Sequence, residues 1–136
     1  MKNNRLGKID VSTLNVPPEK HEYETAKYFA KRGIDITFIK PSDIKGTNSP
    51  DFEMCGKYWE TKSPTGSNIR TYEDNFKKAL KQSDNIIFDL RRLKPLDEIK
   101  CLNRLLRMRK ISKLKTLLVI LRDGRLLTIK GKFDII

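Results

Sequence analysis

The stretch SPDFEMCGKYWETKSP (residues 49–64) joins two short strand-like runs through a glycine. Residues 51–55 and 58–63 form the runs, because apolar side chains alternate there with charged ones. Gly56-Lys57 between the runs suits a two-residue type II′ turn, which favours glycine at its first position. The stretch therefore predicts a β-hairpin.

This turn fixes the cross-strand neighbours and the two faces of the hairpin. We expect Asp51 to lie opposite Lys62, and Glu53 opposite Glu60. Because side chains alternate between faces along a strand, these four charged residues share one face. The other face, which we expect to be buried, carries Phe52, Met54 and Trp59.

The charged face of the hairpin suits metal chemistry. Neighbouring carboxylates repel each other unless a cation lies between them, and Mg²⁺ prefers one or two carboxylates together with water and phosphate oxygens. Asp51 and Glu60 offer such a pair, and Lys62 could orient or deprotonate a nucleophile or stabilise charge on a phosphate. The alternative is a solvated hairpin in which Lys62 only pairs with Asp51, with Glu53 in water near the turn.

Outside the hairpin, periodicity and turn residues predict the remaining elements. Helices are expected over 18–32, 71–83 and 95–111, and strands over 34–40, 85–90, 116–122 and 126–130. The order implies an α/β fold in which a mixed β-sheet is flanked by helices. We expect a loose leader over residues 1–17 and a single domain over residues 18–136.

The first helix, expected over 18–32, places one carboxylate on its apolar side. Glu22 falls on the stripe formed by Ala26 and Phe29, whereas Glu24 points to the opposite side. A carboxylate on an inward face needs a partner, which a metal and a lysine would supply. Alternatively, Glu22 is a first-turn charge favoured by the helix macrodipole.

Four further polar residues are candidates around this site. His21 adjoins Glu22 and either acts as an acid or base near neutral pH or is a partly exposed helix-start residue. Thr65 belongs to the loop that follows Lys62 directly. Asn75 and Gln82 lie on one flank of the second helix, where they either contact the substrate or are ordinary surface amides.

The charge of the chain favours polyanionic partners. Its 29 Lys and Arg residues outnumber its 17 Asp and Glu residues, which gives a net charge of +12. Between Arg91 and Lys115, ten basic residues accompany two acidic ones, and part of this run forms an amphipathic helix. Such a surface binds phosphates without sequence preference, although a solvated helix face would also carry charge. The candidate substrate-docking residues are Arg104, Arg107 and Lys110.

Several classes of protein do not fit the sequence. Two cysteines are too few for a disulfide scaffold, and one histidine excludes most zinc ligand sets. No apolar run approaches the ~18 residues of a membrane span, and residues 1–5 lack the apolar stretch that is typical of a signal peptide.

Two levels of resemblance emerge from these residues. Glu22 on an opening helix, Pro50-Asp51 and Glu60-Thr61-Lys62 resemble the PD-(D/E)xK pattern of the restriction-endonuclease-like nuclease superfamily. Three longer stretches resemble the C-terminal tRNase toxin domains of contact-dependent growth inhibition (CdiA-type) proteins: HEYETAKYFAKRGIDITFIKPS, SPDFEMCGKYWETKSPTG and KQSDNIIFDLRR.

The resemblance implies a site and an activity. Glu22, Asp51 and Glu60 would be the metal ligands, for Mg²⁺ or Mn²⁺, and Lys62 would be the catalytic lysine. The substrate would be RNA, commonly tRNA, in the cytoplasm of a competing bacterium that receives the domain as part of a larger delivered protein. A stand-alone chain would be cytoplasmic.

The same resemblance implies a cognate immunity protein. To bind this basic chain quickly, that protein should be acidic, since opposite net charges steer association. Because the carboxylate hairpin would repel an acidic partner, we expect the immunity protein to cover mainly the basic helix between Lys100 and Lys110.

Three other functions remain as alternatives. One is a DNase of the same fold, of resolvase or restriction type. Another is a non-catalytic basic module that binds nucleic acid, although such a module has no need for clustered carboxylates. The third is a structural protein that binds an acidic partner, which explains the charge but leaves the hairpin without a role.

Overall fold

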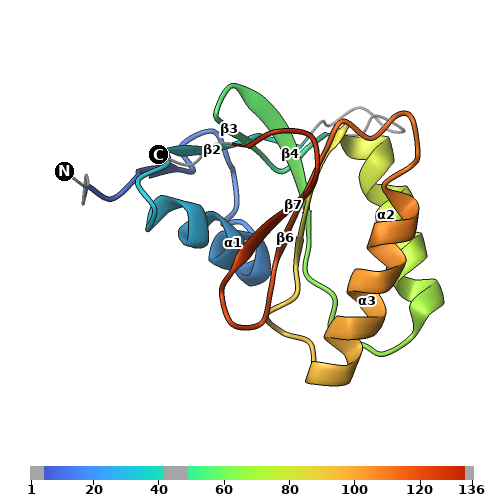
Figure 1. The fold of residues 1–136 in the computed structure, drawn as a ribbon. Helices are drawn as coiled ribbons and strands as arrows, with labels where there is room; N and C mark the ends of the chain where they lie inside the picture. The colour runs from blue at the N-terminus through green and yellow to red at the C-terminus, as the bar shows by residue number, and fades with distance from the viewer. Residues whose placement is uncertain (1–4, 42–48, 134–136) are drawn as a thin grey trace.

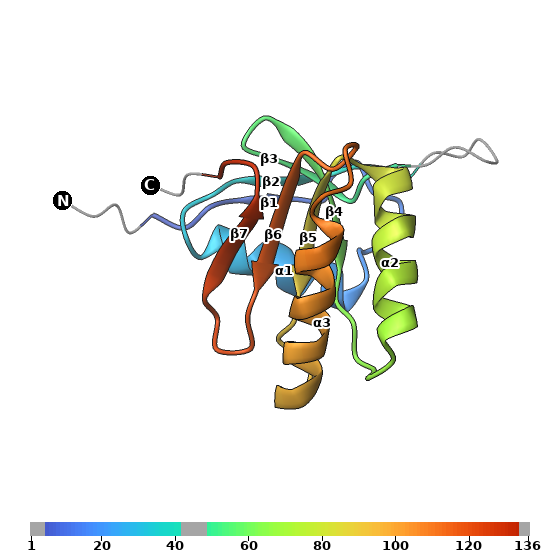
Figure 2. The ribbon, with the colours of Figure 1, turned by 45° about the vertical axis from the view of Figure 1, so that its right-hand side comes forward.

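The computed structural model describes residues 5–41 and 49–133. In this part of the chain, a seven-stranded mixed sheet has its strands side by side in sequence order, and three helices cover it. Helix α1 packs on one face, and α2 and α3 on the other (Figures 1 and 2). The elements are β1 (Ile9–Asp10), α1 (Lys20–Ala30), β2 (Ile36–Phe38), β3 (Phe52–Met54), β4 (Lys57–Lys62), α2 (Ile69–Gln82), β5 (Asn85–Asp89), α3 (Pro95–Met108), β6 (Thr116–Ile120) and β7 (Leu126–Lys130).

The predicted α/β class is confirmed, and the strand directions explain where polar residues gather. Strands β4, β5 and β6 are parallel, while β3 and β7 run antiparallel to their neighbours. Helices α2 and α3 are the crossovers between the parallel strands, as parallel pairing requires. Lys62 therefore ends β4 at the same edge of the sheet where Asp89 ends β5.

The hairpin turn lies one residue earlier than predicted. Cys55 and Gly56 are its central residues, because Met54 pairs with Lys57. Both central residues have positive φ, 54° and 76°, as a type I′ turn requires and a type II′ turn does not. The twist of a type I′ turn matches that of the flanking strands, and Gly56 adopts positive φ at no steric cost.

This shift corrects the predicted cross-strand neighbours. Glu53 lies opposite Tyr58, not Glu60. Continuing the register places Asp51, just before β3, opposite Glu60, so Lys62 is not the partner of Asp51. The predicted apolar face is confirmed as buried: Phe52, Met54 and Trp59.

Two hydrophobic cores lie on the two sides of the sheet. One packs α2 and α3 against β5 and β6, and the apolar stripe that the sequence predicts for α2 is buried in it: Tyr72, Phe76, Ala79 and Leu80. The other packs α1 against the hairpin and the central strands, with Ala26 and Phe29 fully buried. The phase predicted for α1 is therefore right, and it fixes where Glu22 points.

The apolar periodicity of the sequence predicts that Leu96 and Ile99 face the core at the start of α3, and this prediction is wrong. The buried residues there are Asp97 and Cys101, whereas Leu96 and Ile99 are 73% and 56% exposed. Tertiary packing here overrides the hydrophobic stripe.

Two smaller differences concern ends of elements. Helix α2 begins at Ile69, because Asn68 caps it by accepting from the N–H of Arg70, and not at the predicted Thr71. Within the stretch 1–17, where the sequence predicts no strand, Ile9–Asp10 pairs with β2 as a two-residue strand too short to show periodicity. The loop expected over residues 41–50 lies mostly outside the described residues. Among the described helices, none has the length and apolar character to cross a membrane.

Candidate active site

Four charged residues meet at the edge of the sheet where β4 ends. Glu60 and Lys62 belong to β4, Asp51 immediately precedes β3, and Glu22 lies in the first turn of α1. We call these four residues the carboxylate–lysine cluster. Their side chains interact directly, as the contacts below show, so the structure brings together residues far apart in the sequence.

Asp51 is held in place by the residue between Glu60 and Lys62. Its Oδ2 accepts from the backbone N–H of Thr61 at 2.8 Å and from Thr61 Oγ1 at 2.9 Å. Its own N–H donates to the carbonyl of Trp59 at 2.9 Å. These bonds use one carboxylate oxygen of Asp51 and fix the carboxylate at the mouth of the hairpin.

Glu22 contacts Asp51 from the opposite side. The two side chains share a hydrogen bond, and the carboxylate of Glu22 also accepts from the backbone N–H of Glu19 at the start of α1. Burial first, and then the charge of Asp51, raise the pKa of Glu22 from an ordinary 4.5 to about 7. Glu22 therefore holds its proton to a higher pH than an ordinary glutamate does unless a cation binds.

Glu60 is the most buried member of the cluster, with a relative exposure of 5%. Its Oε2 lies 3.5 Å from Nζ of Lys62, and its Oε1 is buried without a hydrogen-bond partner among the described residues. Burial and then the negative charge of Asp51 raise its pKa to about 8, against the opposing effect of Lys62.

The chemistry of Glu22, Asp51 and Glu60 suits a divalent cation, whereas the group of described residues whose ligand atoms all lie within 4.8 Å of one another is Glu19, His21 and Glu22. A buried carboxylate oxygen without a partner costs free energy, and Oε1 of Glu60 is such an oxygen next to two further carboxylates. A cation among the three would give Oε1 a partner and remove the repulsion that raises both pKa values. Ligands that are all oxygen suit Mg²⁺ or Mn²⁺.

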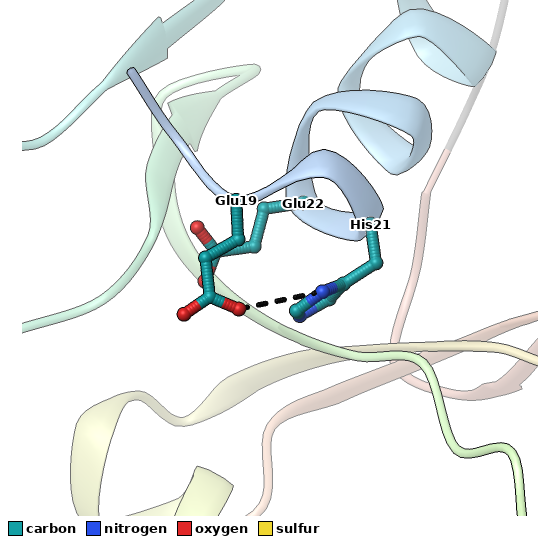
Figure 3. A group of neighbouring side chains, drawn as sticks. All are labelled: Glu19, His21 and Glu22. Atoms are coloured by element: carbon teal, nitrogen blue, oxygen red, sulfur yellow. Dashed lines mark ion pairs between the residues drawn. The ribbon is translucent and has the colours of Figure 1, made fainter. Parts of the chain in front are cut away.

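Glu22 also faces a second group of possible ligands. Glu19, His21 and Glu22 each have a ligand atom within 4.8 Å of the others, and Figure 3 shows their side chains converging below the start of α1. Nδ1 of His21 lies 3.4 Å from Oε2 of Glu19. His21 is thus half-buried and paired with Glu19. Glu22 belongs both to this group and to the carboxylate–lysine cluster.

The cluster is open to a substrate on one side. A pocket of about 390 Å³ is lined by Glu22 and Asp51, together with Pro17-Pro18 and Phe38. The pocket is wide enough for a small group such as a phosphodiester with part of its sugar. We call it the carboxylate pocket.

The other residues singled out in the sequence do not line the carboxylate pocket. Glu53 is exposed on β3, and Thr65 is exposed on the loop after β4. Asn75 is half-buried in the middle of α2, and Gln82 ends that helix near the start of β5, at the edge of the sheet opposite to Lys62. Three basic residues lie in or just after the second half of α3, on the side of the sheet that α1 does not cover: Arg104, Arg107 and Lys110.

Sequence analysis missed a buried polar network beside the cluster. Oγ1 of Thr25 donates to Oδ2 of Asp89 at 2.8 Å, and Arg91 donates to both carboxylate oxygens of Asp89 at 2.9 and 2.7 Å. Arg91 also donates to the carbonyl of Glu24. The network fastens α1 to the end of β5. The sequence signal for this network was Asp89, a carboxylate at the end of an otherwise apolar strand.

These features define an α/β domain with a carboxylate–lysine cluster at one edge of a mixed sheet. The same fold occurs in a solved structure of the CdiA-CT/CdiI toxin and immunity complex from Burkholderia pseudomallei, with a TM-score of 0.63 and 20% sequence identity. The match covers 92% of this chain and 100% of that chain. A search of curated proteins finds no match.

The family model of the contact-dependent growth inhibition CdiA C-terminal domain matches residues 48–126. The chain belongs to this family. The matched region contains Asp51, Glu60 and Lys62, and α1 with Glu22 precedes it. The family-level resemblance predicted from the sequence is thereby confirmed, while membership of the PD-(D/E)xK superfamily stays a prediction.

Proposed function

We propose that this chain is a metal-dependent endoribonuclease toxin of PD-(D/E)xK type that cleaves tRNA in a competing bacterium. The observation that carries the proposal is the unpartnered, buried Oε1 of Glu60 beside Asp51, Glu22 and Lys62. Buried carboxylates that raise each other's pKa destabilise a fold and occur mainly where a site needs them. A module that only binds nucleic acid has no use for them.

Each residue of the cluster has a role in this proposal. Asp51, Glu60 and Glu22 would hold a divalent cation, which when bound neutralises charge on the scissile phosphate. Thr61 keeps Asp51 oriented. Lys62, 3.5 Å from Glu60, orients the attacking nucleophile or stabilises the charge that develops on the phosphate oxygens.

Membership of the CdiA C-terminal domain family supports delivery as part of a larger protein. The solved toxin and immunity complex with the same fold supports a protein partner for this chain. The net charge of +12 favours a nucleic acid as the substrate and an acidic immunity protein as the partner.

The test is cleavage of defined nucleic acids by the purified chain. Total tRNA and plasmid DNA are incubated with the chain, with Mg²⁺, with Mn²⁺ or with a chelator. We expect tRNA to be cut only when a divalent cation is present. Cleavage of plasmid DNA in place of tRNA would instead establish the DNase alternative, and cleavage in the chelator would exclude metal dependence.

Two pairs of variants link the activity to the cluster. Lys62→Ala and Asp51→Ala should each abolish cleavage while the far-UV circular dichroism stays unchanged. Glu53→Gln is the matched control for Glu60→Gln, because Glu53 lies on the same hairpin but is exposed. Full activity of Lys62→Ala or Asp51→Ala would overturn the site.

A further inference from the structure

A second pocket lies on the other side of the start of α1. Its volume is about 410 Å³, and its lining includes Lys20, His21, Ser63, Arg91 and Arg92. Lys20 and His21 come from the first turn of α1, while the other three follow the ends of β4 and β5. We call it the basic pocket.

The charges of the basic pocket do not cancel. Asp89 neutralises Arg91 through a pair of 2.7 Å, and Glu24, which also lines the pocket, lies 3.7 Å from Lys27. Within the described residues, neither Lys20 nor Arg92 has an ion pair. The pocket therefore keeps two cations for a ligand, and a concave surface with an excess of positive charge attracts anions.

Hydrogen-bond donors supplement these cations. The side chain of Glu19, the N-cap residue of α1, makes no cap hydrogen bond, so N–H groups of the first turn and the positive end of the helix macrodipole lie at the helix start. Oγ of Ser63 is buried and has no hydrogen-bond partner in the described chain. The guanidinium of Arg92 donates to the carbonyl of Ser63, which holds this cation beside the pocket. A ligand with several acceptor oxygens would satisfy these donors.

The basic pocket and the carboxylate–lysine cluster are formed by residues that are neighbours in the sequence. Ser63 directly follows Lys62, and His21 directly precedes Glu22. The first turn of α1 thus separates a pocket lined by carboxylates from a pocket lined by cations. A polynucleotide crossing this turn would place successive phosphates in the two pockets.

We propose that the basic pocket binds the backbone phosphate next to the scissile one, with Lys20 and Arg92 as its two charged ligands. The proposal rests on the proposed function and adds to it the position of the substrate strand. It assigns substrate positioning to the α1 face of the sheet, which the basic residues of α3 do not reach.

The test measures binding separately from cleavage. The parent protein is the cleavage-blocked Lys62→Ala variant, and the probe is fluorescein-labelled tRNA in Mg²⁺, followed by anisotropy at several salt concentrations. Lys20→Ala and Arg92→Ala are added together. Lys31→Ala is the matched control, because Lys31 is an exposed lysine at the opposite end of α1. Circular dichroism checks that every variant is folded.

We expect the double variant to bind tRNA about tenfold more weakly than the parent, which corresponds to about 1.4 kcal/mol of binding free energy. The slope of log affinity against log salt should fall by roughly 0.7–0.9, which corresponds to one phosphate contact. The control should match the parent in both quantities. In the chain that retains Lys62, the Lys20→Ala and Arg92→Ala substitutions together should raise the KM for tRNA cleavage more than they lower kcat.

The other results are equally decisive. Unchanged affinity and slope in the double variant would overturn the pocket while leaving the nuclease proposal intact. A parent that does not bind tRNA would overturn both. Inorganic phosphate is the last probe. It could raise the melting temperature of the parent but not of the double variant, while both bind tRNA equally. The pocket would then bind a free anion, and its proposed role in RNA binding would be wrong.

Discussion

Oγ1 of Thr25 on α1 donates a hydrogen bond of 2.8 Å to Oδ2 of Asp89 at the end of β5. This bond joins α1, which carries Glu22, to β5, the strand that pairs with β4 beside Lys62. Asp89 is 4% exposed and also holds Arg91. The network is thus the physical reason why the first turn of α1 faces the cluster.

Asp89→Ala should lower the free energy of unfolding by about 3 kcal/mol, because it removes a buried charge and leaves Arg91 and Thr25 without their partner. Urea denaturation measures this change. Asp84→Ala is the control: Asp84 pairs with Lys115 at 3.7 Å at a partly exposed site, where a loss of about 0–1 kcal/mol is expected. Equal effects of the two substitutions would show that the network does not anchor α1.

The two glutamates of α1 should differ in function. Glu22→Gln should reduce cleavage at least a hundredfold, about 2.7 kcal/mol of transition-state stabilisation, because Glu22 contacts Asp51. Glu24→Gln should retain at least wild-type activity, since Glu24 pairs with Lys27 and its negative charge opposes an anion in the basic pocket. Steady-state cleavage of tRNA distinguishes the two. Similar losses in both variants would mean that Glu22 acts only through the charge of the helix start.

The raised pKa of Glu60 predicts how stability depends on pH. Below its ordinary pKa of 4.5, Glu60 is protonated in both the folded and the unfolded chain. As the pH rises towards about 8, the unfolded chain releases this proton more readily than the folded chain. The free energy of unfolding therefore falls progressively as the pH rises from 4.5 to about 8. Glu22, with a pKa of about 7, acts in the same direction.

Melting temperatures in a chelator, from pH 5 to pH 8, test this dependence. The wild-type chain should lose stability as the pH rises, and Glu60→Gln should remove much of the loss. Mg²⁺ should restore stability at pH 8, where the ionised carboxylates bind it most strongly. Glu53→Gln should keep the wild-type dependence. A melting temperature that rises steadily up to pH 8 in the chelator would contradict the burial of Glu60.

The hairpin explains why sequence reasoning found the site but misplaced its register. Moving a two-residue turn by one position shifts the cross-strand partners by two residues, and a shift of two keeps each side chain on its face. The charged face of Asp51, Glu60 and Lys62 was therefore predictable, whereas the partner of each residue was not. Contacts between distant segments, such as Thr25 with Asp89, carry no periodic signal, and at the start of α3 the periodic signal of Leu96 and Ile99 points to the wrong face.

The turn itself yields a stability prediction. Cys55 has a φ of 54°, a conformation that costs about 1–2 kcal/mol for most residues and less for asparagine. Asn-Gly is the preferred type I′ pair, so Cys55→Asn should raise the free energy of unfolding by about 0.5–1 kcal/mol. Chemical denaturation measures the gain. A loss of stability would instead support the type II′ turn with Lys57 at its second position.

The basic surface of α3 should serve association more than chemistry. Arg107 and Lys110 are exposed, and Arg104 is half-buried, on the face of the sheet opposite to α1. Reversing these three charges to glutamate should therefore slow the association of an acidic immunity protein and reduce its dependence on salt, because electrostatic steering acts mainly on the association rate. The rate of the chemical step, measured at saturating tRNA, should stay close to that of the wild type.

Stopped-flow association with the protein encoded beside this chain provides the measurement, and Lys31→Glu on the opposite face provides the control. We expect the triple variant to associate at least tenfold more slowly at low salt and the control to associate at nearly the wild-type rate. The difference should disappear at high salt, where the Debye length falls to about 3 Å at 1 M. An immunity protein that is basic would contradict electrostatic steering by α3, and one whose association is slowed by Lys31→Glu and not by the triple variant would place the interface on the α1 side of the sheet.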